Sequence, residues 1–403
     1  MSADSAARAE AIARDQYGRL LALLASRTRD IAAAEDALAE AFAKALQTWP
    51  KRGVPDNPAA WLLTTARNRL TDTHRRALKE APLDAAPPPQ ANPPTDMTDA
   101  DATQPDDRLK LMFVCAHPAL DARVHTPLML QCVLGLEAAE IAPAFLLAPA
   151  TLAQRLVRAK RKIKNAGVAF AIPEMQDWPE RVPPVLEAIY AAHALDWLAP
   201  RDALGEEALY MADLLVRLLP DHAEAMGLFA LICMSHARRD ARVRAGRFVP
   251  LPEQDTSLWD AQLATLGLTT LQRAAKLGTP GRFQLEAAIQ SVHHQRAETG
   301  ETNWKALLHL HGALLRTAPS LGAHVSYGVC LAETKGPDDG LAYLDKLLPE
   351  AQSFQPWWAS RASILRSKNA LSAAADAYDT ALSLTHDPLL QAYLTQQRSA
   401  CGH

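Results

Sequence analysis

The sequence predicts an all-α fold, in which two small helical domains joined by a Pro/Asp-rich linker are followed by an α-solenoid of helix pairs. Apolar residues, 49% of the chain, recur at spacings of three and four almost throughout, which is the period of a helix with one buried face. Alternating runs of β-branched residues, typical of half-buried strands, are nearly absent. Two breaks in composition, at 81–107 and 169–184, separate the helical stretches.

The composition bounds the class of protein. A chain of 403 residues exceeds one hydrophobic core, so we expect several domains. The formal net charge is only −3, so any surface that binds nucleic acid must be local. Five scattered cysteines are typical of reduced thiols in a cytosol. No apolar run approaches the roughly 20 residues that span a membrane, and the first residues carry charges where a secretory signal is apolar. We expect a cytoplasmic protein with no membrane partner.

The first helical domain, residues 1–80, begins with a helix that has an acidic face. Asp30 can cap this helix, which is expected to run to about Trp49 because Pro50 follows. Asp36 and Glu40 lie one turn apart on the side that is expected to be exposed. The opposite apolar stripe is formed by Leu38, Ala41, Phe42, Ala45 and Leu46.

The next helix of this domain carries polar and basic residues. Asn57 followed by Pro58 is a typical helix start, with an Asx cap and proline at the first helical position. The outward residues are expected to be Asn68, Asp72, Arg75 and Arg76. Trp61 could stack on an unpaired base, but a tryptophan on a helix more often belongs to the core.

A linker occupies residues 81–107. It contains seven prolines, six aspartates and no basic residue, so it cannot pack a core and is expected to be disordered and semi-stiff.

The second helical domain, residues 108–170, ends in a basic helix. The stretch 151–167 contains six cationic and no acidic residues, and Pro149 is expected in its first turn. A short helix followed by such a helix is the helix-turn-helix arrangement, whose second helix enters the major groove of DNA. The inner stripe is expected to be Leu152, Leu156, Ala159 and Ile163. Alone, such a helix could equally be a solvated amphipathic surface.

The third domain, residues 171–403, contains a degenerate repeat. Gly328, Leu331, Gly340, Leu344 and Leu347 recur 34 residues later as Ala362, Leu365, Ala374, Tyr378 and Ala381. Thirty-four residues is the tetratricopeptide period. We expect roughly five helix pairs from about Pro184 onward, stacked as a solenoid.

The first two domains resemble the extracytoplasmic-function sigma factors of the sigma-70 family, which give bacterial RNA polymerase its choice of promoter. The similarity lies in three stretches that follow in the family's order: AAAEDALAEAFAKAL, AWLLTTARNRLTDTHRR and GLEAAEIAPAFLLAPATLAQRLVRAKRKI. The whole chain is similar to the subgroup with a C-terminal tetratricopeptide-like extension. The resemblance implies a sigma region 2 in residues 1–80, a sigma region 4 in residues 108–170, and core RNA polymerase and promoter DNA as partners.

The resemblance also implies site residues. Contacts to core polymerase would come from Glu35, Asp36 and Glu40. Contacts to the −10 element would come from Trp61, Asn68, Arg69, Asp72, Arg75 and Arg76. Contacts to the −35 element would come from Thr151, Gln154, Arg155, Arg158, Arg161 and Lys162. In members of the subgroup the extension is needed for activity, and here it would regulate or support initiation and offer a surface to a protein partner.

Of four departures from the family, two lie in the expected helix-turn-helix, one replaces a cysteine pair by Cys115 and Ala116 before His117 and Pro118, and one is the stretch IYAAHALDWLAP early in the extension. Pro143 falls inside the expected first helix of the helix-turn-helix and should kink it. Glu137 stands where the family often has Ser or Thr as the helix cap. The alternative function is therefore a repeat-type scaffold on a degenerate sigma module that no longer initiates. A regulator that binds DNA alone is a third interpretation, which the acidic helix disfavours.

The sequence gives no sign of an enzyme. It contains no glycine-rich phosphate loop, no nucleophile elbow and no catalytic carboxylate–histidine cluster. Cys115 and His117 make only a two-ligand fragment of a metal site. We expect no catalytic residue, no metal and no cofactor.

Overall fold

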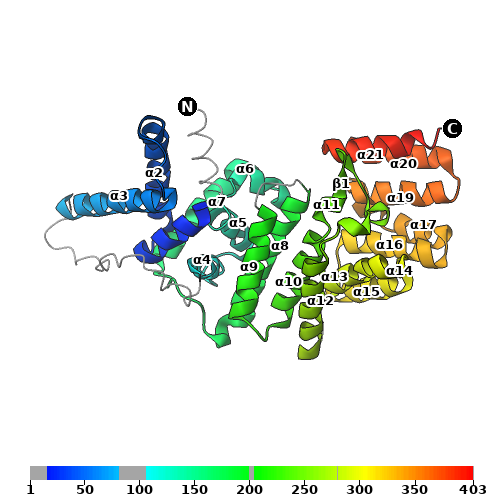
Figure 1. Cartoon of the computed structure of the whole chain (residues 1–403), viewed down its shortest axis with the longest axis horizontal. Coiled ribbons are helices and arrows are strands. Elements are labelled where there is room, and N and C mark those ends of the chain that lie inside the picture. Colours follow the sequence, from blue (N-terminus) through cyan, green and yellow to red (C-terminus); the bar gives the residue numbers. More distant parts are fainter. Residues whose placement is uncertain (1–15, 81–105, 199–203, 279, 403) are drawn as a thin grey trace. The chain divides into compact units, whose positions relative to one another are not determined.

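The computed structural model describes residues 16–80, 106–198, 204–278 and 280–402, and in these residues the predicted all-α fold is confirmed. The described residues form helices, apart from loops and one short antiparallel hairpin in which Val243 pairs with Phe248. The chain forms two compact units, residues 1–218 and 219–403 (Figure 1). The domain limits expected from the sequence remain predictions.

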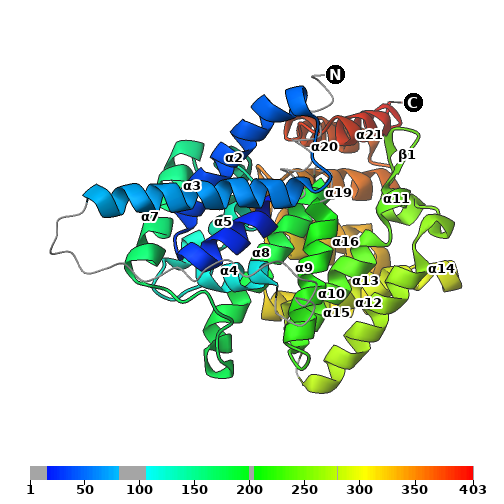
Figure 2. The ribbon, with the colours of Figure 1, turned by 60° about the vertical axis from the view of Figure 1, so that its left-hand side comes forward.

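The first unit consists of helices. Residues 16–28 form the first, and it is followed by α2 (Ile31–Arg52), α3 (Pro58–Glu80), α4 (Asp107–Cys115), α5 (Ala122–Cys132), α6 (Ala138–Ile141), the 3-10 turn η2 (Ala142–Phe145), α7 (Pro149–Asn165), η3 (Met175–Asp177), α8 (Trp178–Leu198) and α9 (Leu204–Leu218). Figures 1 and 2 both show the C-terminal end of α3 extending beyond its neighbouring helices.

Local capping signals set the start of α2 and α3. Asp30 caps α2, because its Oδ1 accepts a hydrogen bond from the backbone N of Ala33 at 3.1 Å. Asn57 caps α3 in the same way, accepting from Ala60 N at 3.0 Å. The predicted end of α2 at Trp49 is three residues short, since a proline in the last turn costs only one helical hydrogen bond and the helix continues to Arg52.

The predicted apolar stripe of α2 is correct at its centre and wrong at its edge. Leu38, Ala41 and Ala45 are buried, Phe42 is half-buried, and Leu46 is 50% exposed. At about 100° per residue, Leu46 lies about 80° around the helix from Leu38. It therefore falls outside the face that packs on the core.

The second unit is also helical. Its elements are α10 (Ala223–His236), α11 (Arg239–Arg242), β1 (Val243–Arg244), β2 (Arg247–Phe248), η4 (Leu251–Glu253), η5 (Thr256–Leu258), α12 (Ala261–Ala274), η6 (Ala275–Leu277), α13 (Arg282–His294), α14 (Arg296–Thr299), α15 (Trp304–Thr317), α16 (Leu321–Lys335), α17 (Pro337–Asp345), α18 (Leu348–Ala351), α19 (Gln355–Ser367), α20 (Leu371–Ser383) and α21 (Pro388–Ser399).

The small residues of the 34-residue repeat lie where helices approach closely. A Cβ on Gly328 would lie 2.6 Å from Leu344 Cδ2, and a Cβ on Gly340 would lie 2.5 Å from Ala332 Cβ. Their counterparts one period later, Ala362 and Ala374, are fully buried in the α19–α20 pair. Equivalent residues thus occupy equivalent places in α16–α17 and α19–α20, while membership of the tetratricopeptide class remains a proposal.

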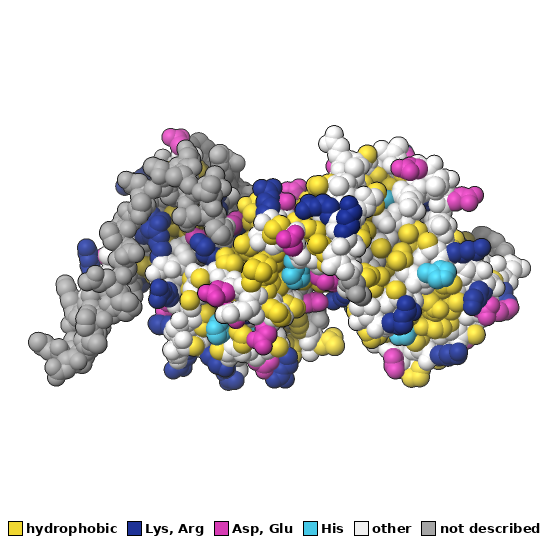
Figure 3. All heavy atoms as spheres, turned by 90° about the horizontal axis from the view of Figure 1, so that it is seen from below, with side chains coloured by type: hydrophobic (Ala, Val, Ile, Leu, Met, Phe, Trp, Pro, Cys, Tyr) yellow, Lys and Arg dark blue, Asp and Glu magenta, His cyan; other side chains and the backbone are white. Residues whose placement is uncertain are grey.

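On the face shown in Figure 3, hydrophobic side chains reach the surface among charges of both signs. None of the described helices is both long and apolar enough to cross a membrane.

Candidate nucleic-acid interface

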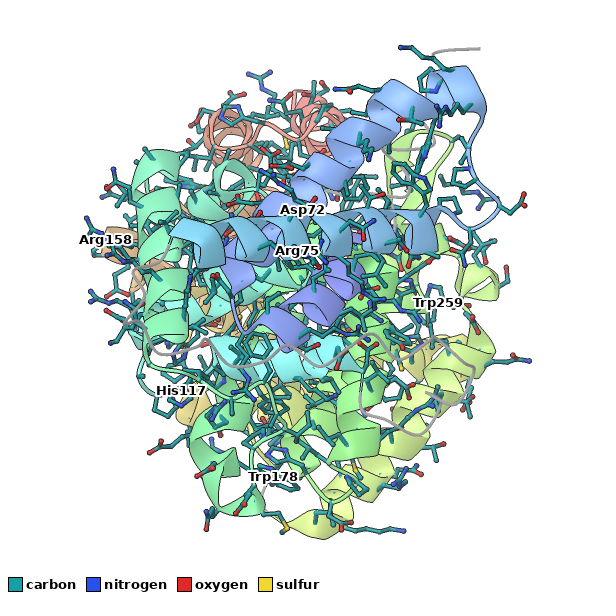
Figure 4. The ribbon with its side chains drawn as sticks, turned by 90° about the vertical axis from the view of Figure 1, so that its left-hand side faces the viewer. Asp72, Arg75, His117, Arg158, Trp178 and Trp259 are labelled. Carbon is teal, nitrogen blue, oxygen red and sulfur yellow. The ribbon has the colours of Figure 1, made fainter. Side chains whose placement is uncertain are left out.

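The predicted −10 residues lie on α3. Asn68, Asp72 and Arg75 are exposed, and Figure 4 shows the last two on this helix. Arg69 is half-buried and its Nε lies 2.5 Å from Glu40 Oε2. The side chain of Arg76 lies outside the described residues. The exposed residues are thus one or two turns apart on α3, as binding along a strand of DNA requires.

The Arg69–Glu40 ion pair joins two residues expected to serve different partners. Glu40 belongs to the predicted polymerase-binding set and Arg69 to the predicted DNA-binding set. The side chains of Arg69 and Glu40 are 39% and 54% exposed, so the pair stabilises the fold by no more than about 1 kcal/mol. Either residue can therefore leave the other at little cost.

Trp61 packs mainly as a structural residue. It is half-buried, and its ring meets that of the buried Trp49 edge to face, with centroids 5.6 Å apart. This geometry is what the commoner interpretation of a helical tryptophan predicts. Capture of a DNA base by Trp61 remains a prediction.

The predicted −35 residues lie on α7. The four residues of the inner stripe are buried, as expected, and Pro149 is the first residue of the helix. Arg155 is half-buried, and Figure 4 shows Arg158 pointing away from the unit. The exposed members of the predicted set are Thr151, Gln154, Arg158, Arg161 and Lys162.

The helix that precedes α7 is short. Helix α6 ends at Ile141, and the chain continues as the 3-10 turn η2, because Pro143 has no N–H to donate to the carbonyl of Ala139. At the start of α6, the backbone N of Glu137 donates to Glu140 Oε2 at 2.7 Å, which is the bond that the third helical residue makes in a capping box. The first element of the predicted helix-turn-helix is therefore one helical turn followed by η2.

A buried ion pair joins α2 to α7. The Nζ of Lys160 lies 2.6 Å from both carboxylate oxygens of Glu35. The Lys160 side chain is 7% exposed and that of Glu35 is 20% exposed. The Nζ of Lys164 also lies 2.7 Å from Asp30 Oδ2. In this structure Glu35, a predicted polymerase contact, is therefore bound to the predicted DNA-reading helix.

The surroundings of this ion pair are polar and buried. Cys132 Sγ lies 3.8 Å from Glu35 Oε1. Burial, and to a lesser degree the charge of Glu35, raises the pKa of Tyr17. A hydrogen bond with Cys115 and burial hold the pKa of the Cys132 thiol well above its ordinary value. Both cysteines are buried and free. No three His, Cys, Asp or Glu side chains among the described residues gather as a metal site would require.

Sequence reasoning missed the role of Lys160, although a signal was present. Lys160 follows Leu156 by four residues, which puts it about 40° around the helix from that buried residue and next to the inner stripe. The basic character of the segment concealed this position. Only five of its six cations lie outside the buried contact.

Comparison with known proteins finds a similar family for each of two stretches of the chain. Sigma-70 region 2 matches residues 12–80, and a family of unknown function, DUF6596, matches residues 181–275. An uncharacterized protein of Rhizobium meliloti (strain 1021) is 33% identical over 383 residues, which cover 92% of this chain and 90% of that protein. No solved structure matches the chain. The chain therefore belongs to the family that includes this Rhizobium meliloti protein, and its residues 12–80 are similar to sigma-70 region 2.

Proposed function

We propose that the chain is a sigma factor of the extracytoplasmic-function type, which directs RNA polymerase to specific promoters and whose C-terminal tetratricopeptide-like repeats support or regulate initiation. The observation that carries the proposal is the region 2 match to residues 12–80. Within that stretch, α2 exposes an acidic face and α3 exposes polar and basic residues. These are the two surfaces that joint binding of polymerase and DNA requires.

Polymerase would bind the acidic face of α2. Asp36 and Glu40 are exposed in the free chain, so they are available for a basic patch on the enzyme. Glu35 is bound by Lys160, and it can contact polymerase only after α2 and α7 separate. The proposed function therefore includes an opening of the α2–α7 contact on the path to the active complex.

DNA would bind α3 and the outer face of α7. Exposed cations on α7 suit phosphate contacts, and Thr151, Gln154 and Arg158 near its N-terminal half suit contacts to base edges. The buried inner stripe packs α7 against the rest of the first unit. The outer face of α7 is therefore presented to DNA by a helix that is fixed in place.

The test is run-off transcription with purified core polymerase on a library of promoter fragments from the source bacterium. The full chain is compared with a chain that ends at Leu218. This end keeps α8 and α9, because Arg181 of α8 donates a buried hydrogen bond to the carbonyl of Phe113 and Arg108 of α4 pairs with Glu207 of α9. Arg158→Ala tests the DNA face, with Lys305→Ala as the matched loss of one exposed charge in the second unit.

The outcomes separate the two functions. Initiation by the full chain alone supports a sigma factor whose extension is required, and initiation by both chains makes the extension a modulator. In either case Arg158→Ala should reduce initiation and Lys305→Ala should not. If neither chain initiates although both bind core polymerase, the sigma proposal fails. The alternative, a scaffold on a degenerate sigma module, is then favoured, in line with the shortened α6.

A further inference from the structure

Three ion pairs of the first unit share one pattern. Each joins a carboxylate of α2, or of its cap, to a cation on one of the two helices that the proposed function assigns to DNA. Helix α2 packs against both of these helices, α3 and α7. The pairs are Glu40–Arg69 at 2.5 Å, Glu35–Lys160 at 2.6 Å and Asp30–Lys164 at 2.7 Å.

The carboxylates of these pairs occupy cations that lie close to the predicted DNA contacts. Carboxylates and phosphates both present anionic oxygens to a cation, so they compete for the same partner. Lys164 is 60% exposed and lies one turn beyond Arg161, an exposed member of the predicted −35 set. Arg69 directly follows Asn68, an exposed member of the predicted −10 set. Both cations could therefore reach a bound DNA strand, but in the free chain each is held by a carboxylate.

We propose that α2 competes with DNA for these cations in the free chain, and that RNA polymerase, by binding the carboxylates of α2, releases the cations to DNA phosphates. This inference rests on the proposed function, because it requires one partner for α2 and another for α3 and α7. It adds Lys164 to the residues that contact DNA. It also gives α2 a second role, since the helix that binds polymerase is the helix that restrains DNA binding.

The three pairs differ in what releases them. Lys160 is 7% exposed, so it becomes available only after α2 and α7 separate. The side chains of Arg69 and Lys164 reach solvent, so each can turn away from its carboxylate without movement of a helix. Such exposed pairs are weak, and each holds its cation by a factor of up to about 5. Removal of the carboxylate should therefore raise the affinity of that cation for a phosphate by up to about 5-fold.

The competition acts in both directions. When one ligand changes the affinity for a second, the second changes the affinity for the first by the same factor. DNA that binds Arg69 therefore leaves Glu40 available to polymerase, and polymerase that binds Glu40 leaves Arg69 available to DNA. The effect can accordingly be measured from either side.

The first experiment measures the DNA affinity of the full-length chain without polymerase. The probes are a labelled single strand and a labelled duplex of mixed sequence, because phosphate contacts do not depend on the base sequence. Fluorescence anisotropy is read at about 0.1 M salt, where exposed charges more than about 10 Å apart are largely screened.

The variants remove a charge with little change of shape. Glu40→Gln releases Arg69, and Asp30→Asn releases Lys164 while keeping the helix cap, because asparagine caps a helix as well as aspartate does. Asp56→Asn is the matched control. Asp56 is an exposed carboxylate between α2 and α3, and it pairs with no cation in the described part of the chain.

We expect Glu40→Gln to bind the single strand, and Asp30→Asn the duplex, about 2- to 5-fold more tightly than the wild type does. Asp56→Asn should bind both probes as the wild type does. In an Arg69→Met or a Lys164→Met background, respectively, the gain should vanish, because the cation that the carboxylate held is gone. Unchanged DNA affinity in both variants, or an equal gain in Asp56→Asn, overturns the proposal.

The second experiment measures the affinity of core polymerase for the chain in the absence of DNA. Arg69→Met leaves Glu40 without its partner on α3, so this affinity should rise by up to about 5-fold. Lys305→Met removes one exposed charge from the second unit and should leave the affinity unchanged. Equal polymerase affinities of Arg69→Met and the wild type would overturn the part of polymerase in this proposal. If the wild type does not bind core polymerase at all, the proposed function fails, whereas the DNA measurements still decide whether α2 competes with DNA.

Discussion

Replacing Lys160 by methionine removes the cation from the buried ion pair between α7 and α2. The aliphatic stem is retained, so the packing of the side chain changes little. Glu35 then remains in a site where its side chain is 20% exposed, and the ammonium group that lay 2.6 Å from its carboxylate, Lys160 Nζ, is gone. Removal of one partner of a buried pair costs about 3 to 5 kcal/mol. Since a fifth of Glu35 still meets solvent, we take the lower end, about 3 kcal/mol.

This cost applies only while α2 and α7 are in contact, because in an open chain Glu35 is hydrated. The ratio of open to closed molecules should therefore rise by roughly 150-fold, at 1.4 kcal/mol for each factor of ten. If opening precedes polymerase binding, the apparent affinity for core polymerase should rise by up to that factor. Fluorescence anisotropy of the labelled chain measures this affinity, and hydrogen exchange of the α2 and α7 amides measures the opening.

Matched variants isolate the ion pair. Lys164→Met removes a cation that is 60% exposed and should change both measurements by less than about 1 kcal/mol. Glu35→Gln combined with Lys160→Met leaves no buried charge, so the amide exchange of α2 and α7 should slow again toward that of the wild type. Unchanged exchange and affinity in Lys160→Met would refute the sequestration of Glu35. Faster exchange without tighter polymerase binding would refute the polymerase role of Glu35.

Three further predictions concern the remaining structure. Gly340→Ala should destabilise the second unit by about 1 to 3 kcal/mol in urea unfolding, because the new Cβ lies 2.5 Å from Ala332 Cβ. Gly322→Ala, whose Cβ meets no atom within 4 Å, should not destabilise it. Equal effects of the two substitutions would contradict the close packing at Gly340. Arg158→Ala should reduce the slope of log K against log salt for promoter DNA by about 0.9 in a titration of the salt concentration, and an unchanged slope would remove Arg158 from the phosphate contacts. Burial lowers the pKa of His311 to about 4 in the folded chain, so the unfolded chain binds this proton more readily. The contribution of neutral His311 to stability is therefore complete above about pH 6.5. As the pH falls toward 4, the free energy of unfolding should decrease by about 3 kcal/mol. Urea unfolding at pH 7 and pH 4 should show a smaller difference for His311→Phe than for the wild type, and an equal difference would place the titration elsewhere.

The features that the sequence predicted correctly are local. Asp30 and Asn57 cap helices because their side chains reach the backbone N–H three residues ahead, and the α7 stripe follows from its spacing. The ion pair of Lys160 with Glu35 joins residues 125 positions apart, and no local pattern specifies such a pairing. The apolar groove that His311 lines likewise depends on four helices, α13, α15, α16 and α19, which meet only in the fold. At Pro143 the sequence predicted a kinked helix, because proline has no backbone N–H to donate. In the structure α6 ends at Ile141 instead, and the chain continues as the 3-10 turn η2.

The packing of α8 limits how chains of this family could have been assembled in evolution. Helix α8 packs against α4 and α5, and its buried Arg181 bonds the carbonyl of Phe113, so it completes the core of the first unit. The DUF6596 match, residues 181–275, therefore begins inside one unit and continues into the other. An ancestral fusion immediately after α7 would have left the face of α5 without its cover. We therefore expect recombination between relatives to be tolerated near residue 218 and to be damaging near residue 170. Chimeric proteins joined at residue 218 should accordingly give a higher yield of folded protein than chimeric proteins joined at residue 170.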